Sequence, residues 1–211
     1  MGNSKKSNIL PIFPQGLGLY KLSVELPKNL KKKIEKLDNL KYEVDHGFHG
    51  HNSYNIENKG SAMDDLGLKG LKKHMQTYVE SYCEETGFKY GIITHDWVVS
   101  LPKGGHIEKR NYINSYMSGI YYPYESKDST SLILLDIKAI ILANAKKDEN
   151  MDNYQSNIAK GTHFSTTSVS IKPEQGLLVI FPSYMYSYLP KTKNNLLSIH
   201  FNTCREDLII E

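Results

Sequence analysis

The sequence predicts a mainly β protein with flanking helices, an α+β fold built around one β core. Helical periodicity ends at Gly87, and from Phe88 onward the chain consists of short segments rich in Val, Ile, Tyr and Thr. Gly, Pro, Asn and Lys separate these segments, and no helical pattern comes between them. Consecutive strands of this kind pair into antiparallel sheets, which form a sandwich, a jelly roll or a barrel.

The composition is that of a single globular domain. Hydrophobic residues make up 39% and charged residues 23% of the 211 residues, and no Pro/Gly/Ser-rich linker divides the chain. We expect residues 61–211 to form the β core with its packing helix. Residues 1–60 should add a strand and a helix as an N-terminal decoration of the same domain.

The N-terminal part begins with an extended segment. Residues 12–26 are rich in the β-branched, aromatic and glycine residues typical of such chain. Pro27 then suits the first turn of a helix in which Leu30, Ile34 and Leu37 share one face. This short helix should lie on a sheet.

A longer helix is predicted from Ser61 to Thr86. Ser61 and Asp64 have the spacing of a capping box at its start, and Gly87 suits its end. Charged residues cover most of its surface, whereas one stripe is apolar and should face the core. The stripe consists of Leu68, Leu71, Met75, Tyr78 and Tyr82.

Six strand-like segments follow this helix. Each has the β-branched and aromatic content of a strand and is bounded by turn-forming residues. The segments are residues 88–101, 115–124, 131–140, 164–173, 176–189 and 194–202.

Charge and hydropathy argue against several partners. The formal net charge is +3, and the basic run from Lys31 to Lys33 is followed by Glu35, a pattern that favours a solvated helix face over a nucleic-acid patch. No apolar run approaches the roughly 20 residues of a membrane helix. The N-terminus lacks the apolar region of a signal peptide. We expect no nucleic acid or membrane partner and a cytoplasmic location, or an assembled particle if a phage encodes the chain.

Three stretches of the β half resemble one family. They are Trp97 with KGGHIEKRNYINSYMSGIYY, then GLLVIFPSYMYSYLP, and then LLSIHFN. In this order they are similar to the small iron(II)/2-oxoglutarate-dependent oxygenases of marine bacteria and tailed phages. Together with the preceding helix, the resemblance covers residues 61–211. It implies a double-stranded β-helix, or jelly roll, as the core.

The resemblance also implies four site positions, and none holds the family's residue. The family's His-x-His or His-x-Asp pair falls on Arg110 and Tyr112, and its later histidine falls on Ser187. The arginine that grips 2-oxoglutarate falls on Leu196. Arginine has no accessible lone pair, tyrosine coordinates only as a phenolate, and leucine cannot make a bidentate contact with a carboxylate. The facial triad that iron requires is therefore missing from these positions.

A displaced metal site is the alternative. His106 and Glu108 form a His-x-Glu pair four residues ahead of the expected place, which is about 13 Å along a strand. His200 alternates onto the predicted cavity face and would be the third ligand, so iron(II) and 2-oxoglutarate would bind at His106, Glu108 and His200. The competing interpretation makes the first two a surface turn and His200 a core residue. Arg110 would then fill the former cavity, bonded to backbone or to Glu108, or it would bind an anion.

Two functions follow from these interpretations. The first is an oxygenase-like protein without cofactors that acts as a non-catalytic binding or assembly subunit, with other protein subunits as partners and a phage particle as one setting. The second is an active iron(II)/2-oxoglutarate-dependent hydroxylase with a rearranged metal site. The loss of all four matched positions favours the first, and with it a protein that is not an enzyme.

Overall fold

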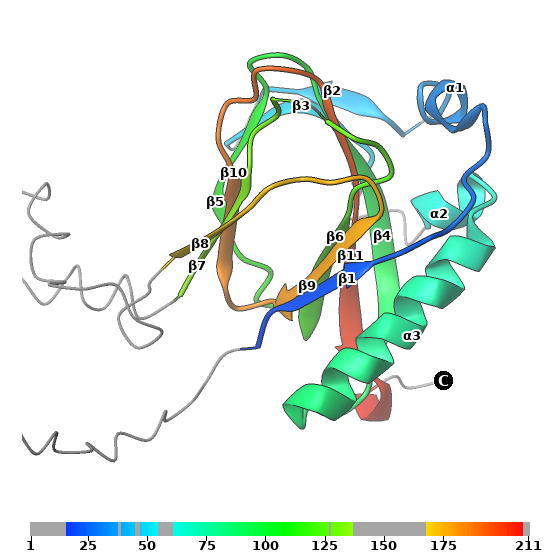
Figure 1. Ribbon diagram of the computed structural model, residues 1–211, viewed down its shortest axis with the longest axis vertical. Coiled ribbons are helices and arrows are strands. Elements are labelled where there is room, and N and C mark those ends of the chain that lie inside the picture. Colours follow the sequence, from blue (N-terminus) through cyan, green and yellow to red (C-terminus); the bar gives the residue numbers. More distant parts are fainter. Residues whose placement is uncertain are drawn as a thin grey trace, which may run out of the picture.

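The computed structural model describes residues 16–37, 39–44, 47–54, 61–126, 128–136 and 168–208. Within these residues, eleven strands form one strongly curled antiparallel sheet, with helices outside it (Figure 1). The predicted jelly-roll fold is confirmed. The strands are β1 (Gly18–Lys21), β2 (Lys41–Glu43), β3 (Phe48–Asn52), β4 (Gly91–Leu101), β5 (His106–Arg110), β6 (Met117–Tyr121), β7 (Leu132–Leu135), β8 (Ser168–Ile171), β9 (Leu177–Pro182), β10 (Tyr186–Leu189) and β11 (Leu196–Arg205).

The curled sheet has two halves that face each other. One half runs β1-β9-β6-β11-β4, and the other runs β5-β10-β7-β8. Strand β3 joins them, because its His51 and Asn52 pair with β4 while its Phe48 and His49 pair with β5. The longest pairing is that of β4 with β11, which extends from Gly91 and Arg205 to Leu101 and Leu196.

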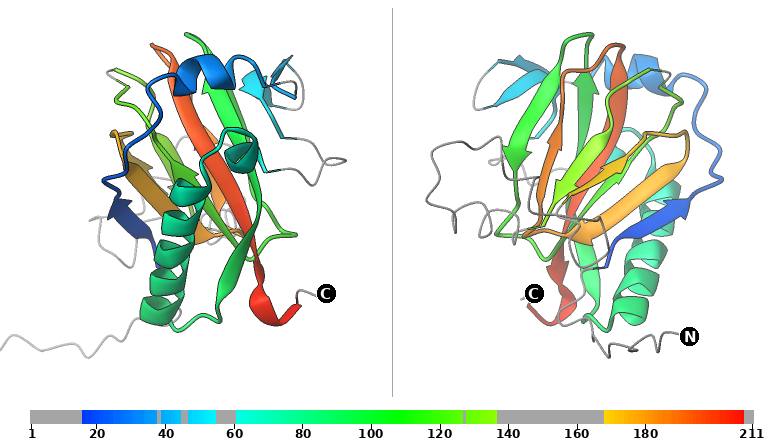
Figure 2. Two further views of the ribbon diagram at one scale, coloured as in Figure 1. Left: turned by 90° about the vertical axis from the view of Figure 1, so that its right-hand side faces the viewer. Right: turned by 60° about the vertical axis from the view of Figure 1, so that its left-hand side comes forward.

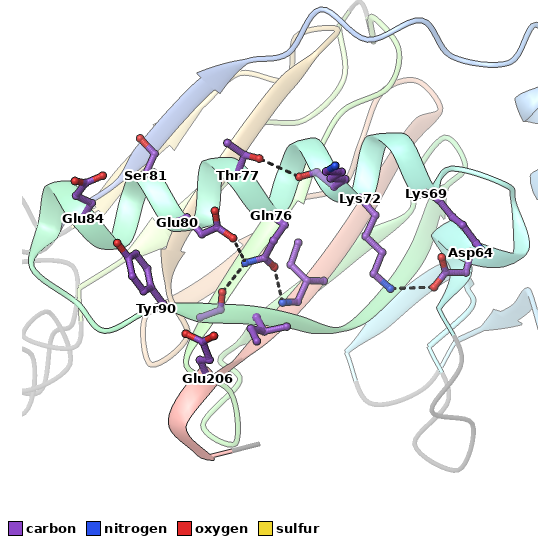
Figure 3. Close-up of a pocket in the computed structure, with 14 residues that line it drawn as sticks. Asp64, Lys69, Lys72, Gln76, Thr77, Glu80, Ser81, Glu84, Tyr90 and Glu206 are labelled. Carbon is purple, nitrogen blue, oxygen red and sulfur yellow. Dashed lines mark hydrogen bonds and ion pairs between the residues drawn. The ribbon is translucent and has the colours of Figure 1, made fainter. Parts of the chain in front are cut away.

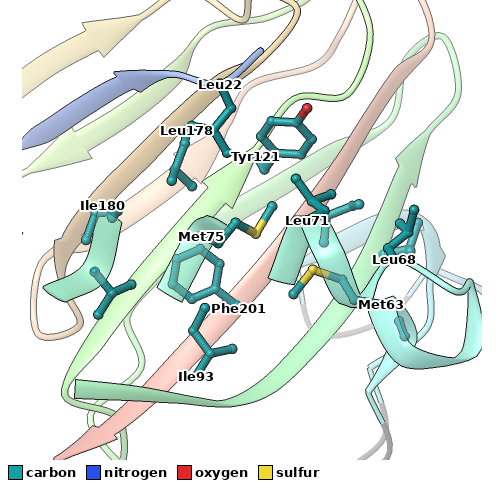
Figure 4. Close-up of a cluster of buried hydrophobic side chains, with 14 of the residues drawn as sticks. Leu22, Met63, Leu68, Leu71, Met75, Ile93, Tyr121, Leu178, Ile180 and Phe201 are labelled. Atoms are coloured by element: carbon teal, nitrogen blue, oxygen red, sulfur yellow. The ribbon is translucent and has the colours of Figure 1, made fainter. Parts of the chain in front are cut away.

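Helices cover the outer face of the first half. The helices are α1 (Leu30–Ile34), α2 (Ala62–Asp65) and α3 (Lys69–Thr86), with a final 3-10 turn at Glu206–Leu208. Figure 2 shows α3 lying across the half that contains β4 and β11. Beneath it, Leu71 and Met75 pack against Phe201 and Ile180, as Figure 4 shows. This cluster of α3 and sheet side chains is the outer core.

A second apolar cluster, the inner core, lies between the two halves. Side chains from both halves meet there, because alternate residues of each strand point inward. Trp97 and Val99 of β4 meet Ile107 of β5, Leu134 of β7 and Leu189 of β10. Residues that alternate along the strands therefore face the outer core and the inner core in turn.

Asp96 ties the helices to the sheet. Its carboxylate accepts hydrogen bonds from Ser61 Oγ and from the Met63 backbone N–H, both at 2.6 Å, and lies 3.1 Å from Lys72 Nζ. The Asp96 side chain is fully buried, whereas the Asp64 side chain, also bonded to Lys72, is 42% exposed. Burial lowers the pKa of Lys72, but Asp96 and Asp64 outweigh that effect and raise it. Lys72 therefore stays charged.

The structure corrects three details of the predicted elements. The helix expected over residues 61–86 is interrupted after Asp65, because Gly67 adopts a φ of +72° and turns the chain. The strand expected over residues 176–189 divides into β9 and β10. Strands β2 and β3 lie in a part of the chain where no strand was predicted. No helix in the described ranges has the length and apolar character to cross a membrane.

Candidate functional site

A cavity of about 350 Å³ opens between the two halves of the sheet. Its floor is aromatic: the ring centroid of Trp97 lies 5.0 Å from that of Tyr54 and 5.7 Å from that of Tyr112. Polar side chains stand around this floor. The lining residues are Phe48, Asn52, Tyr54, Trp97, Val99, Ile107, Glu108, Lys109, Arg110, Asn111, Tyr112 and His200.

Arg110 is the last residue of β5 and lines this cavity. Its Nη2 donates a hydrogen bond to the Gly47 carbonyl oxygen at 3.3 Å. Its guanidinium carbon lies 5.8 Å from the centroid of the Phe48 ring, within range of a cation–π contact. Opposite it on β10 stands Ser187, which is 6% exposed. Two positions that the family resemblance singled out are thus direct neighbours across the strands.

Tyr112 reaches the same cavity from the turn that follows β5. Its backbone N–H donates to the Ser183 carbonyl oxygen at 2.9 Å, which fixes the turn against the end of β9. Burial raises the pKa of the Tyr112 phenol to about 12, although Arg110 works in the opposite direction. The phenol therefore keeps its proton at neutral pH.

His200 enters the cavity from β11. It lies between Trp97 of β4 and Ile120 of β6, and it is 3% exposed. Ser198 Oγ and His200 Nε2 are 2.9 Å apart and share a hydrogen bond. Burial lowers the pKa of His200 to about 3, with a further contribution from the charge of Arg110. The ring is therefore neutral.

The remaining sequence-predicted residues lie in different places. Leu196 is 1% exposed, belongs to the inner core and does not line the cavity. Glu108 lines the cavity, but His106 does not, and the His106 ring packs against His49 of β3 instead. Among the described residues, no three His, Cys, Asp or Glu side chains come close enough together to hold a metal ion. His106, Glu108 and His200 therefore do not form such a group.

The described donors of the cavity do not fit iron(II). A guanidinium is permanently protonated and repels a cation, and a protonated phenol is a poor ligand for this ion. Among the lining residues, Glu108 supplies one carboxylate, and a facial triad also needs two imidazoles. Only His200 offers an imidazole, and Ser198 already occupies its Nε2. The arrangement suits an anionic or hydrogen-bonding group that would meet Arg110 above the aromatic floor.

Sequence reasoning missed the contribution of β3. Phe48 and Asn52 line the cavity, yet no strand was predicted around them. The available signal was the alternation of the segment FHGHN, in which Phe48, Gly50 and Asn52 are buried and the two histidines between them are half-buried. A five-residue alternation with a glycine in its middle was too short to predict a strand.

A larger, open groove lies on the outside, between α3 and the start of β4 (Figure 3). Gln76 spans it: its amide nitrogen donates to the Gly91 carbonyl oxygen at 2.8 Å, and its amide oxygen accepts from the Ile93 N–H at 3.0 Å. The Gln76 side chain thereby satisfies the free edge of β4. Lysines line one end of the groove and glutamates the other. This groove is remote from the positions that the family resemblance marks.

Comparisons with known proteins agree with this fold. A prolyl hydroxylase from Trichoplax adhaerens, solved with a hypoxia inducible factor oxygen degradation domain peptide fragment, has a TM-score of 0.58 and 12% identity, with 91% of this chain and 84% of that chain covered. AviO1 from Streptomyces viridochromogenes Tue57 has a TM-score of 0.58, 10% identity and coverage of 91% and 90%. A Pseudomonas putida prolyl-4-hydroxylase has a TM-score of 0.53, 13% identity and coverage of 91% and 94%. At these identities the likeness concerns the fold alone.

The sequence comparisons are more specific. Among curated proteins, none matches the chain significantly. The family model described as "Putative 2OG-Fe(II) oxygenase" matches residues 95–202, which is half of the chain and includes most of β4, most of β11 and the cavity residues from Trp97 to His200. The resemblance inferred from Trp97, the Ser-Gly-Ile-Tyr-Tyr strand and the Phe-Pro-Ser turn is thereby confirmed. The chain belongs to the 2OG-Fe(II) oxygenase family.

Proposed function

We propose that this family member is a non-catalytic protein, which uses the oxygenase scaffold as a binding or assembly subunit. The observation that supports this proposal is Arg110 in the cavity, at the place where the family resemblance puts a metal ligand. A cation and a guanidinium repel each other, so one residue both removes a ligand and opposes the ion. Once iron no longer binds, the positions of Tyr112, Ser187 and Leu196 have no ligand or co-substrate to hold.

Those other changes are consistent with the loss. Ser187 offers a hydroxyl, and the phenol of Tyr112 stays protonated with a pKa of about 12. Leu196 is part of the apolar core, so it gives no charge to the distal carboxylate of 2-oxoglutarate. A single exchange would be a ligand swap, whereas four exchanges that occur together favour the loss of both metal and co-substrate binding.

Protein subunits are the partners we propose. The chain contains 15 tyrosines, and Tyr42, Tyr54, Tyr90 and Tyr184 are each at least 40% exposed. Tyrosine is enriched in protein interfaces because its ring adds contact area and its hydroxyl adds a hydrogen bond. An assembled particle, such as that of a phage, is one setting in which such a subunit would act.

Turnover of 2-oxoglutarate tests the proposal. The full chain, incubated with iron(II), ascorbate and 2-oxoglutarate, should form no more succinate than a reaction without protein. Succinate formed in proportion to the protein would overturn the proposal and favour the rearranged hydroxylase.

A second experiment tests the assignment of the positions. The triple variant Arg110→His, Tyr112→Asp and Ser187→His places the family's ligand types on the three positions. It should bind iron(II) in calorimetric titration where the parent protein shows no binding at this site. Equal binding by parent and variant would mean that these residues do not govern the metal site. The same titration of a His106→Gln variant shows whether any iron binds at His106, which lies outside the cavity.

A further inference from the structure

Two histidines stand directly opposite each other outside the cavity. His49 of β3 pairs in register with His106 of β5. Their ring centroids are 5.6 Å apart, and the ring planes are nearly perpendicular at 83°. Neither residue lines the cavity, so the pair is separate from the site described above.

The two rings differ in their hydrogen bonds. Tyr42 Oη and His49 Nε2 are 2.6 Å apart, which orients the His49 ring and leaves its Nδ1 as the nitrogen without this bond. His106 Nδ1 is buried and has no hydrogen-bond partner in the structure. Leaving a buried nitrogen without a hydrogen-bond partner is unfavourable, so such an atom points to a ligand that satisfies it.

The spacing fits a shared metal ion. Zinc–nitrogen bonds of about 2 Å and tetrahedral angles place the centroids of two bound imidazoles about 5 Å apart. The observed 5.6 Å is within a small side-chain adjustment of that value. The tyrosine behind His49 corresponds to the outer partner that ligating histidines commonly have, which fixes the ring and its tautomer.

We propose that His49 and His106 bind a divalent transition metal ion of the kind that prefers imidazole, namely copper, zinc or nickel. Because the described residues contain no group of three such ligands, water completes the coordination and the site is exchangeable rather than structural. Among these ions, copper(II) binds tightest, following the usual order of divalent metals.

Calorimetric titration of the full chain with copper(II) and with zinc(II) tests the site. The parent protein should bind one ion, and His49→Gln and His106→Gln should each abolish that binding. The matched control is His51→Gln, because His51 is on the same strand, also contacts the Tyr42 ring and lies opposite Ser100 rather than His106. The control should bind like the parent. No binding by the parent, or binding that survives both substitutions, overturns the proposal.

Two further measurements distinguish loss of a metal ligand from loss of folding. Tyr42→Phe removes the outer partner while both imidazoles remain, and it should weaken binding about tenfold to a hundredfold. In the unmodified protein, substoichiometric copper(II) should broaden the ring proton signals of His49 and His106 before those of the exposed His95 and His74. This second readout needs no variant, so it decides the question even if a substitution disturbs folding. An ion that broadens all histidines equally overturns the proposal.

Discussion

His200 is neutral inside the protein, and this lowers the free energy of unfolding at acidic pH. Its pKa is lowered to about 3 by burial and by Arg110, whereas an unfolded histidine titrates near 6.5. Between these two values the unfolded chain binds a proton that the folded chain does not, so the contribution of His200 to stability is complete above pH 6.5 and is lost as the pH falls toward 3. The loss reaches about 1.4 kcal/mol for each pH unit in this window.

We predict that His200→Gln flattens the acid side of the stability profile. Glutamine keeps a hydrogen-bonding group for Ser198 but does not titrate. Urea unfolding at pH 4.5 and pH 7 should give a smaller difference in free energy for the variant than for the parent, by about 2 kcal/mol. His95→Gln, at an exposed position of β4, should retain the parent's difference. If His200→Gln keeps the full difference, another group governs acid unfolding.

The candidate site was partly predictable at the level of single residues. Alternation along β5 and β11 puts Arg110 and His200 on the cavity, as the sequence indicated. Simple alternation would also put His106 and Tyr112 on the face of Arg110, but β5 begins at His106, ends at Arg110 and is irregular opposite Ser187 and Leu189. Tyr112 reaches the cavity from a turn, and His106 is drawn to His49. Such contacts depend on β3, which local periodicity did not reveal.

Asp96 links β4, on which it lies, to α2 and α3. Its carboxylate binds Ser61 and the Met63 N–H at the start of α2, and it pairs with Lys72 of α3. We predict that Asp96→Asn lowers the free energy of unfolding by roughly 3 kcal/mol, because it leaves the partly buried Lys72 ammonium without its buried partner. Asp64→Asn is the control, since that side chain is 42% exposed and its ion pair should contribute less than about 1 kcal/mol. Denaturant midpoints of the two variants measure the difference. Equal, small effects would contradict a linking role for Asp96.

The close approach of β6 and β11 depends on a glycine, which has no side chain. Gly119 lies opposite Phe201, and a methyl group on Gly119 would collide with the Phe201 ring. We predict that Gly119→Ala destabilises the protein by about 1–3 kcal/mol or more, as overpacking does, and that adding Phe201→Leu restores part of the loss. Gly70→Ala is the contrasting control: it has open space in α3 and should gain up to about 1 kcal/mol. Thermal unfolding of the four proteins gives the comparison.

Elements with long, regular patterns were the predictable part of the fold. Ser61 Oγ accepts from the Asp64 N–H at 3.1 Å, and Gly87 ends α3 with a φ of +73°, both as the sequence indicated. The interruption at Gly67 was not predicted because a glycine inside a helical pattern is compatible with both a helix and a turn. The division between β9 and β10 was hidden by the uniform tyrosine and methionine content of residues 184–188.

At the scale of the whole molecule, the N-terminal segments belong to both cores. Leu22, Leu30 and Ile34 are buried in the outer core and Phe48 in the inner core. Strand β1 also covers the edge of β9. We predict that residues 61–211 alone do not fold, because apolar surface would be exposed and the edges of β4, β5 and β9 would lose their partners.

Circular dichroism and size-exclusion chromatography of this fragment measure the outcome. A chain that begins at Gly16 is the control, since it retains every described element and should behave like the parent. A compact, cooperatively unfolding fragment of residues 61–211 would show that the first sixty residues are dispensable.

Strand β3 has a consequence for communication across the molecule. It is held by two residue pairs to β4, two to β5 and three to the short strand β2, whereas β4 and β11 pair along their whole lengths. Local opening should therefore begin at β3, and this event would unseal the cavity at Phe48 and part His49 from His106 at the same time. A ligand in the cavity and an ion on the histidines would each favour the closed strand. By thermodynamic reciprocity each would tighten the other's binding, and both would slow amide hydrogen exchange along β3.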